Sequence, residues 1–422
     1  MVVKGILRVL YAPHKVFKDV VQKPGYLGPL ILLIIFAVAQ VGSYYVTGSK
    51  SYVEQTMPSG LETDVWTENA TLWMANSGVA ISENTVDFIN GSQGLIAIDY
   101  YGNSSIEFAV SNNSMLQMAL GNFDSVDCGP NGFKEVFFRV KIVTPDAAPE
   151  NVTITLCSLS DSNFFYYDLT SAFFNNNVNV WNNISVPVGS GSWLSSGNPN
   201  WENITSLKLD FAWSSDSDID LRVDGLFFRG LFKNQIDFVG GILPYLANSA
   251  LRGLAPFLLE WLLLTGLMYL LIKGLKGNVV LKPLMTAVGY ALITIVIQAF
   301  IVAAVYTTLS DLNYHLEILA YVSGEFEMAR DVLLNQLSTV NLVGSILQIV
   351  MWIWFIPLGT FITRAVTGDK KIAEQVQMGK ALSNATTGEV TPFSWMKCLL
   401  VSGVSLFLTI ILLDFLGALG IA

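Results

Sequence analysis

Five long apolar windows constrain this chain more than any other feature of its sequence. They lie at about 28–47, 254–272, 284–307, 342–363 and 398–418. Each is close to the ~20 residues that an α-helix needs to cross the ~30 Å hydrocarbon core of a bilayer. Only 13% of the residues are charged, whereas soluble domains carry about 25%. The chain is therefore predicted to be a multi-pass membrane protein with the lipid bilayer as its first partner.

A polar segment between the first two windows divides the chain. It is rich in Asn, Ser, Asp and aromatic residues and contains no spanning run. The expected fold class is an α-helical five-span membrane bundle with an inserted all-β antiparallel sandwich. The expected parts are an amphipathic tail (1–25), a first span (26–48), the sandwich (49–235) and four further spans (236–422), with an outer helical loop (308–341) and a cytoplasmic loop (364–397).

The distribution of charge predicts the orientation. The tail and the loops at 273–282 and 364–397 carry 13 basic and four acidic residues, whereas the opposite side carries 10 basic and 27 acidic residues. Basic residues near span ends tend to stay in the cytoplasm. The N-terminus is therefore expected inside, and the C-terminus and the sandwich outside, in the cell membrane rather than an internal membrane.

The first window has two interpretations. The small residues Ala37 and Ala39 in "AVAQ" would suit a signal peptidase, so the window could be a cleaved signal peptide. The preceding 25 residues are long for such a leader, however, and contain two short amphipathic helices with basic residues on one face. An uncleaved membrane anchor is the favoured interpretation.

The polar segment is predicted to form β-strands. Short aromatic and β-branched runs are separated by Gly, Asn, Pro and Asp clusters, which indicates eight or nine strands. In "SLKLDFAW", Leu207, Leu209 and Phe211 alternate with Lys208 and Asp210, so one face is apolar and the other polar. An antiparallel sandwich follows.

Part of this segment resembles a known type of domain. Residues 180–230 resemble the C-terminal half of jelly-roll domains of the carbohydrate-binding-module type, through Trp181, Trp201 and the "VDGL" around Asp224. The resemblance implies the fold more firmly than a ligand. The partners it leaves open outside the cell are a glycan, an envelope component or a protein.

Two features of the sandwich could bind a ligand, and each has a structural alternative. Trp193 lies in a Gly/Ser loop and is either an exposed platform for a sugar ring or a rim residue that caps the core. Asp216, Asp218 and Asp220 alternate along the chain and either gather around a structural calcium ion or form a solvated acidic turn. No other cofactor is expected.

Covalent modification of the sandwich is also predicted. Cys128 and Cys157 could form a disulfide or remain two buried thiols, whereas Cys398 has no partner. Asn-x-Ser/Thr glycosylation sequons occur at Asn69, Asn90, Asn103, Asn112, Asn151, Asn183 and Asn203. An eighth, Asn384, falls on the side predicted to be cytoplasmic.

The membrane part resembles the Yip family of five-span proteins, named for interaction with Ypt/Rab GTPases. The shared features are the lead-in Ala12, Pro13, Phe17 and Pro24, the link with Gly277, the pair Gly289 and Tyr290, and the tryptophans Trp352 and Trp354. The resemblance implies a bundle with a non-catalytic role in membrane organisation. The inserted sandwich and the missing Asp-Leu-Tyr-Gly-Pro motif depart from the family, so a cytosolic GTPase partner stays an open alternative.

No enzyme signature competes with this interpretation. His14 and His315 are expected on opposite sides of the membrane, so no histidine-based zinc site or catalytic triad can assemble. The glycines form no phosphate-binding loop, and no nucleic-acid partner is expected. Three functions remain: a membrane scaffold with a ligand-binding sandwich, a transporter or channel, and a trafficking factor.

The second apolar window contains a carboxylate, Glu260. An ionised group costs at least ~2.5–3.5 kcal/mol at the centre of a bilayer and normally faces a protein interior or cavity. At 1.5 Å per residue, one polar residue on each span lies at a similar depth, roughly 6–14 Å below the outer boundary: Gln40, Glu260, Gln298, Gln348 and Asp414. This layer could be a hydrogen-bonded clasp, a substrate or proton path, or a set of unconnected lipid-facing positions.

Overall fold

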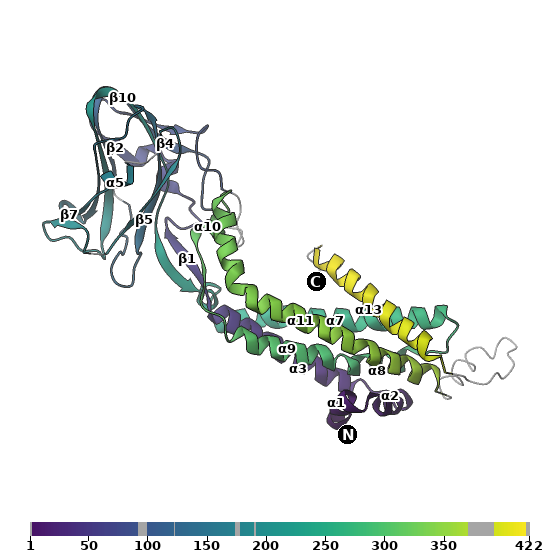
Figure 1. Ribbon diagram of the computed structural model, residues 1–422. Coiled ribbons are helices and arrows are strands. Elements are labelled where there is room, and N and C mark those ends of the chain that lie inside the picture. Colours follow the sequence, from purple (N-terminus) through teal and green to yellow (C-terminus); the bar gives the residue numbers. More distant parts are fainter. Residues whose placement is uncertain are drawn as a thin grey trace. The chain divides into compact units, whose positions relative to one another are not determined.

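The chain folds into two compact units, which Figure 1 shows in the computed structural model. The structure describes residues 2–91, 99–121, 123–173, 178–189, 191–369 and 392–418. The helical unit comprises Met1–Lys50, Gln235–Asp311 and Asn335–Ala422. The β unit comprises Ser51–Asn234 and Leu312–Leu334.

The helical unit contains the five apolar windows. Two short helices, α1 (Val2–Tyr11) and α2 (Pro13–Gln22), precede α3 (Leu27–Ser49), and α6 (Gln235–Phe238) precedes α7 (Ile242–Gly274), α8 (Leu281–Ala291), α9 (Ile293–Tyr306), α11 (Glu325–Thr367) and α13 (Trp395–Ala418). In the described residues, five helices are long and apolar enough to cross a membrane, with α8 and α9 counted as one. The prediction of five such helices is confirmed.

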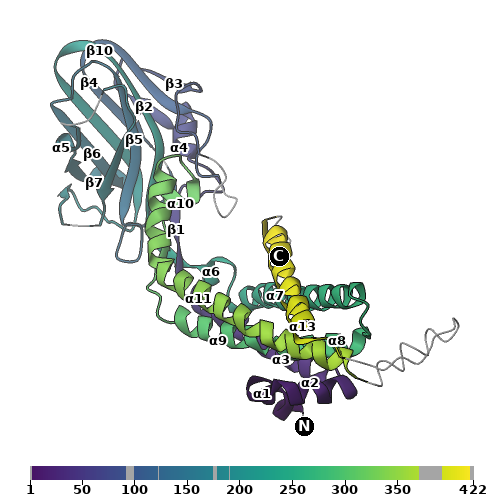
Figure 2. The ribbon, with the colours of Figure 1, turned by 45° about the vertical axis from the view of Figure 1, so that its right-hand side comes forward.

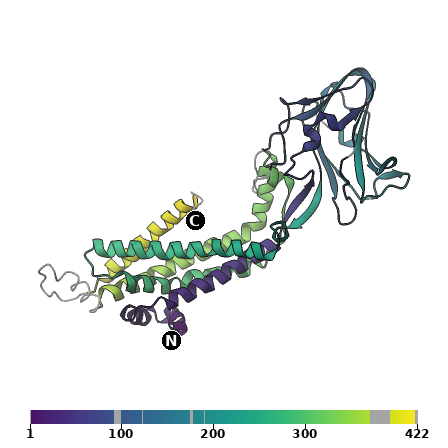
Figure 3. The same cartoon turned by 180° about the vertical axis from the view of Figure 1, so that it is seen from behind.

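Small residues allow α3 and α8 to approach each other closely. A Cβ atom on Gly28 would lie 2.1 Å from the Tyr290 ring, and one on Gly289 would lie 2.6 Å from Pro29. A side chain at position 289 would clash with the proline ring, and one at position 28 would require the Tyr290 ring to move. The Gly289–Tyr290 pair singled out in the sequence therefore lies at the contact between α3 and α8. Figure 3 shows the ribbon from behind.

The tail helices pack their apolar faces on the bundle. Val9 of α1 and Phe17 of α2 are fully buried and belong to the same core cluster as residues of α7 and α8. Lys15 and Lys18 of α2 remain exposed. The amphipathic pattern of the tail therefore reflects burial against the helical unit.

The β unit is built from eleven strands in the described residues. These are β1 (Ser51–Met57), β2 (Trp73–Ala75), β3 (Ala80–Asn84), β4 (Ser105–Leu120), β5 (Glu135–Thr144), β6 (Asn151–Ser158), β7 (Ser160–Asp168), β8 (Asn182–Pro187), β9 (Leu194–Ser196), β10 (Ile204–Asn234) and β11 (Leu312–Tyr314). Short helical segments are α4 (Val65–Glu68), η1 (Ala70–Leu72), α5 (Thr170–Phe173) and α10 (Leu316–Ala320). All strand pairs are antiparallel except β1 with β11.

Two strands, β4 and β10, pass from one layer of the β unit to the other, as Figure 2 shows. The first half of β10 lies between β6 and the end of β4, and its second half lies between β5 and the start of β4. Side chains of both halves, such as Leu209 and Leu221, are fully buried in one core cluster. The predicted antiparallel sandwich is therefore confirmed.

The loop predicted at 308–341 is not simply an outer helical loop of the bundle. Its residues 312–314 form β11 beside β1, and α10 follows directly. Leu316 and Leu319 are each 1% exposed and pack in a cluster with Val53 and Phe227. This burial assigns Leu312–Leu334 to the β unit.

Candidate functional site

Four of the five residues predicted to form an intramembrane polar layer line one pocket of the helical unit. The pocket has a volume of about 260 Å³, and Gln40, Glu260, Gln298 and Gln348 come to it from α3, α7, α9 and α11. Ser43 and Tyr306 add hydroxyl groups to its wall. Among the described residues, no hydrogen bond links Glu260 directly to another side chain. The four side chains surround a shared space.

Asp414 does not belong to this pocket. It is exposed on α13, and it is absent from the lining residues. Equal depth in the bilayer fixes the height of a residue but not the direction in which its helix presents it. The five-member layer of the sequence-based hypothesis is therefore reduced to four members.

Substitution of Glu260 tests whether the pocket stabilises the helical unit. Glu260→Gln should keep the melting temperature in detergent close to that of the wild type, because the amide still donates and accepts hydrogen bonds. Glu260→Leu should lower it, because the three glutamines would then face an apolar group. Glu260→Leu should couple to Gln298→Leu but add independently to Asp414→Asn. Equal melting temperatures for the Gln and Leu variants would contradict a stabilising role.

Trp193 is not an exposed platform. Its side chain is 7% exposed, and its Nε1 donates to the carbonyl oxygen of Pro187 at 2.7 Å. The ring packs against Tyr167 and Trp201, with centroids at 5.4 and 5.5 Å. The ring is buried in the core, so the glycan-stacking hypothesis for Trp193 is wrong and the structural alternative holds.

The three alternating aspartates do not assemble a calcium site. Asp216 and Asp218 are exposed, and Asp218 accepts a hydrogen bond from the Asn112 backbone at 3.1 Å. Asp220 lies beside Arg222, with the carboxylate 3.8 Å from the guanidinium. Alternate residues of an extended strand are about 7 Å apart, so these carboxylates are not gathered around one point.

Another acidic and histidine group does lie close together. Within the described ranges, only the potential ligand atoms of Glu54, His315 and Glu317 come within 4.8 Å of one another as a set of three. Glu54 accepts from the backbone of Leu316 at 2.6 Å, and Glu317 pairs with Arg229 at 2.7 Å. These bonds occupy the carboxylates and attach α10 to the sheet.

The predicted disulfide is not formed. Cys128 and Cys157 are free thiols and are buried. Burial raises the pKa of the Cys128 thiol to about 12. The alternative of two buried thiols therefore describes the structure, and Cys398 is likewise free.

The seven outer sequons all lie in the β unit. Asn90, Asn103, Asn112, Asn151 and Asn183 are exposed, whereas Asn69 and Asn203 are partly buried. The amide of Asn183 donates to Glu325 at 2.8 Å, and its oxygen accepts from Arg139 at 3.0 Å. Modification of Asn183 would disturb these contacts. Asn384 lies outside the described residues.

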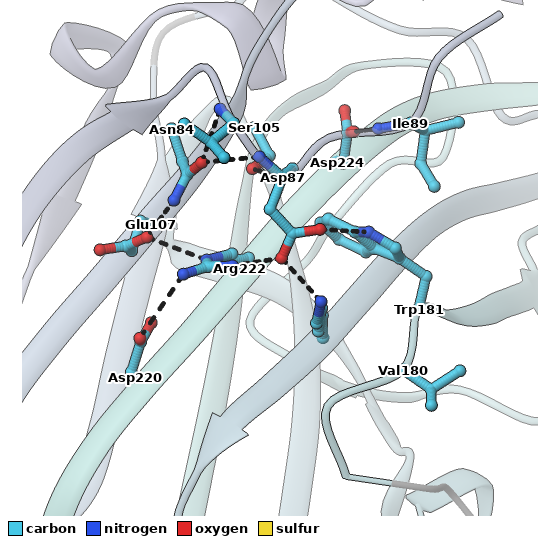
Figure 4. A network of polar contacts seen from close by, with 12 residues as sticks. Asn84, Asp87, Ile89, Ser105, Glu107, Val180, Trp181, Asp220, Arg222 and Asp224 are labelled. Carbon is cyan, nitrogen blue, oxygen red and sulfur yellow. Dashed lines mark hydrogen bonds and ion pairs between the residues drawn. The ribbon is translucent and has the colours of Figure 1, made fainter.

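We call the layer formed by β5, the second half of β10 and the start of β4 the second layer. A charge network covers its outer side, where side chains from these strands converge on Asp87 (Figure 4). Asp87 pairs with Lys141 at 2.7 Å and with Arg222, and it accepts from Trp181 Nε1 at 3.2 Å. Arg222 Nε also donates to Glu107 at 2.9 Å. Although burial alone would raise it, the bonds from Lys141 and Arg222 lower the pKa of Asp87.

This network has a structural role. The segment after β3 is held across the sheet because Ser105 Oγ donates to the Asp87 backbone at 2.7 Å and Asp224 accepts from the Ile89 backbone at 2.6 Å. The charges of Asp87, Lys141 and Arg222 are thus compensated within the protein. Trp181 and Asp224, two residues of the jelly-roll resemblance, serve this attachment.

A buried pair of carboxyl groups adjoins the network. Asp64 and Asp224 are 0% and 1% exposed, and each carboxyl group affects the pKa of the other. Burial raises the pKa of Asp64 to about 6. Burial and then the negative charge of Asp64 raise the pKa of Asp224 well above its usual value. Both carboxyl groups therefore keep their protons to a higher pH than exposed carboxyl groups do.

The first layer contains β6, β7, the first half of β10 and the end of β4. Its outer side is open and polar. Pairing between strands places Gln117, Lys208, Thr155 and Tyr166 on the same side of β4, β10, β6 and β7. Phe211 and the other intervening residues point into the core. We call this side the open face.

A groove of about 340 Å³ crosses the open face beside β2. Its walls include Met74, Asn76, Gln117, Lys208 and Asp210. Burial raises the pKa of Asp210, and the neighbouring Gln117 side chain opposes this rise. Hydrogen-bond donors, acceptors and the exposed Met74 side chain are thus combined within one depression.

The open face was partly foreseeable from the sequence. The alternation in "SLKLDFAW" already placed Lys208 and Asp210 opposite the core. The contributions of Gln117 and Tyr166 were missed because they depend on which strands are neighbours, and a single strand's pattern does not reveal its partners. Trp193, the platform suggested by the sequence, does not belong to the open face, because its ring is buried.

Comparisons with known proteins concern the fold. No protein-family model and no curated protein matches the sequence. A similar solved structure is a family 11 carbohydrate-binding module from Clostridium thermocellum in complex with a β-1,3-1,4-mixed-linked tetrasaccharide, at 14% identity and a TM-score of 0.26, with 41% of this chain and 94% of that chain covered. An exo-β-agarase aligns at 10% identity and a TM-score of 0.27, with 39% of this chain and 24% of that chain covered.

Proposed function

We propose that this chain is a non-catalytic integral membrane protein of Yip type that presents a glycan-binding β unit outside the cell. The five apolar helices form a membrane-spanning bundle in this proposal, and the sandwich is a jelly roll. Support for the orientation comes from the excess of basic residues in the tail and in the loops at 273–282 and 364–397.

The single observation that carries the binding proposal is the open face. Sugar hydroxyl groups each donate and accept hydrogen bonds, and the Gln117 amide, the Asp210 carboxylate and the Lys208 ammonium supply matching groups within one groove. Tyr166 lies further along the same face, and its ring is 6.1 Å from Phe164. Partly exposed rings beside polar groups suit the apolar faces of sugars.

The proposal predicts that substitutions in the groove weaken glycan binding. The full chain, labelled and held in lipid nanodiscs, should bind particular members of a glycan array that includes the mixed-linked tetrasaccharide. Asp210→Ala should weaken that binding at least about tenfold, because a hydrogen bond to a charged group contributes ~1.5–3 kcal/mol. Gln117→Ala should weaken it less.

Asp216→Asn provides the matched control. Asp216 is exposed on the same strand but lies outside the groove, so binding should be unchanged. Failure of every glycan to bind the wild-type chain would contradict the glycan proposal. Equal loss in Asp210→Ala and Asp216→Asn would contradict its placement on the open face.

A transporter is the second candidate, and the intramembrane pocket favours it. A carboxylate, three glutamines and two hydroxyl groups surround one space within the apolar helices, and polar groups at such depth often mark a substrate or proton route. Proteoliposome flux that is lost in Glu260→Gln, with the melting temperature unchanged, would support transport. The absence of any flux would leave the pocket a stabilising feature.

A further inference from the structure

A second pocket of the helical unit combines cationic and aromatic side chains. It has a volume of about 420 Å³, within the ~300–1,000 Å³ range of small-molecule sites. Lys18 reaches it from α2, Arg364 and Phe361 come from α11, and Trp395 comes from the start of α13. We call it the end pocket, because it lies where α11 ends and α13 begins.

The aromatic residues hold the guanidinium in place. The Arg364 guanidinium lies 4.2 Å from the centre of the Trp395 ring, and this ring meets the Phe361 ring edge to face at 5.7 Å. Stacking uses the flat face of a guanidinium and leaves the N–H groups at its edge free to donate. Trp395 remains 52% exposed.

The two cations have no anionic partner in the described part of the chain. No hydrogen bond or ion pair there involves the Lys18 ammonium or the Arg364 guanidinium, although Arg364 is only partly exposed. Asp369 also lines the pocket, but it already has another interaction. His14 completes the polar wall. Within the described residues, the end pocket therefore presents two cations without an ion pair beside apolar ring surfaces.

This combination lies at the ends of apolar helices, where the headgroups of a bilayer would be. The apolar part of α11 ends near Arg364, and the apolar run of α13 starts at Trp395. Tryptophan and basic residues are typical of this depth, and basic pockets between spans bind acidic headgroups. The N-terminus of α13 adds a partial positive charge on the same side.

We propose that the end pocket binds the phosphate group of an anionic phospholipid. Arg364 would pair with two phosphate oxygens through its free edge, and Lys18 would add a second charge. The Phe361 and Trp395 rings would contact the glycerol and upper acyl region. A soluble phosphate compound shares the headgroup chemistry, and the two sources are separated by the experiment below.

Lipid binding by the full chain tests the proposal. Native mass spectrometry in detergent should show that phosphatidylglycerol binds more tightly than phosphatidylcholine. Lys18→Gln or Arg364→Gln should weaken phosphatidylglycerol binding about fivefold each, and the double variant about 30-fold. Lys15→Gln is the matched control, because Lys15 is exposed on the same helix but does not line the pocket.

The outcomes separate a built site from general surface charge. Equal affinity for phosphatidylcholine, or equal weakening by Lys15→Gln and Lys18→Gln, would overturn the proposal. Inorganic phosphate that stabilises the wild type against heating, but not the double variant, would assign the site to a soluble phosphate compound. If Arg364→Gln fails to fold, Arg364→Lys keeps the charge and should retain at least part of the lipid binding, and the exposed Lys18 remains testable by itself.

Discussion

Replacing Arg139 with methionine should destabilise the β unit more than any other single change considered. The Arg139 side chain is 2% exposed and pairs with Glu325 at 2.7 Å. It also donates to Tyr101 Oη at 2.5 Å and lies 4.8 Å from the centres of the Tyr101 and Phe137 rings. Removing one partner of a buried ion pair costs ~3–5 kcal/mol, because the other groups lose their compensation.

The measurement is unfolding of the full chain in detergent, monitored by the circular dichroism signal of the strands. Arg330→Met is the matched control, because Arg330 is on the same helix as Glu325, its side chain is 50% exposed, and its only ion pair in the described residues is with Asp331 at 3.5 Å. It should change the free energy of unfolding by less than ~0.5 kcal/mol. Similar effects of the two substitutions would show that the Arg139 contacts do not stabilise the fold.

The buried carboxyl pair should make the β unit less stable as the pH rises. The unfolded carboxyl groups lose their protons near pH ~3.9, whereas the folded pair holds a proton because both pKa values are raised. The unfolded chain then binds fewer protons, so the free energy of unfolding falls with increasing pH. The shift of Asp64 to about 6 alone corresponds to a loss of ~3 kcal/mol above pH ~4.

Asp64→Asn should remove the part of this pH dependence that comes from Asp64. The asparagine oxygen can still accept from the Gly102 backbone, as Asp64 does at 2.8 Å, and its amide can donate permanently to Asp224. Between about pH 4 and pH 6, the free energy of unfolding of the variant should therefore fall less than that of the wild type. Asp216→Asn, at an exposed position, should melt with the slope of the wild type. A slope unchanged by Asp64→Asn would assign the pH dependence to other groups.

The parts of the fold that depend on local pattern were predictable from the sequence. Apolar windows of sufficient length could only form long helices, and the alternation around Leu207 and Leu209 separated the core side of β10 from its open side. Local pattern does not show that β10 runs on to Asn234 and joins both layers. That arrangement depends on pairing with strands far away in the sequence.

The sequence predicted the depth of the candidate site residues along their helices, but not the direction of their side chains. The predicted depth correctly grouped Gln40, Glu260, Gln298 and Gln348. It could not show that Asp414 is exposed and lies outside the pocket. Composition suggested an exposed Trp193 because its neighbours are Gly and Ser, although the ring itself is buried. Residue type indicated the chemistry, while the direction of each side chain depended on packing.

Because β11 and α10 belong to the β unit, this unit can be completed only after much later parts of the chain have been synthesised. Leu316 bonds to Glu54, 262 residues earlier in the chain, so a ribosome must synthesise α7, α8 and α9 before this contact can form. Until then, the surface of Val53 and Phe227 that α10 covers stays uncovered on the nascent chain. Completion of the β unit is thereby coupled to synthesis of the apolar helices α7, α8 and α9, and a fragment that stops at residue 234 would retain an apolar patch.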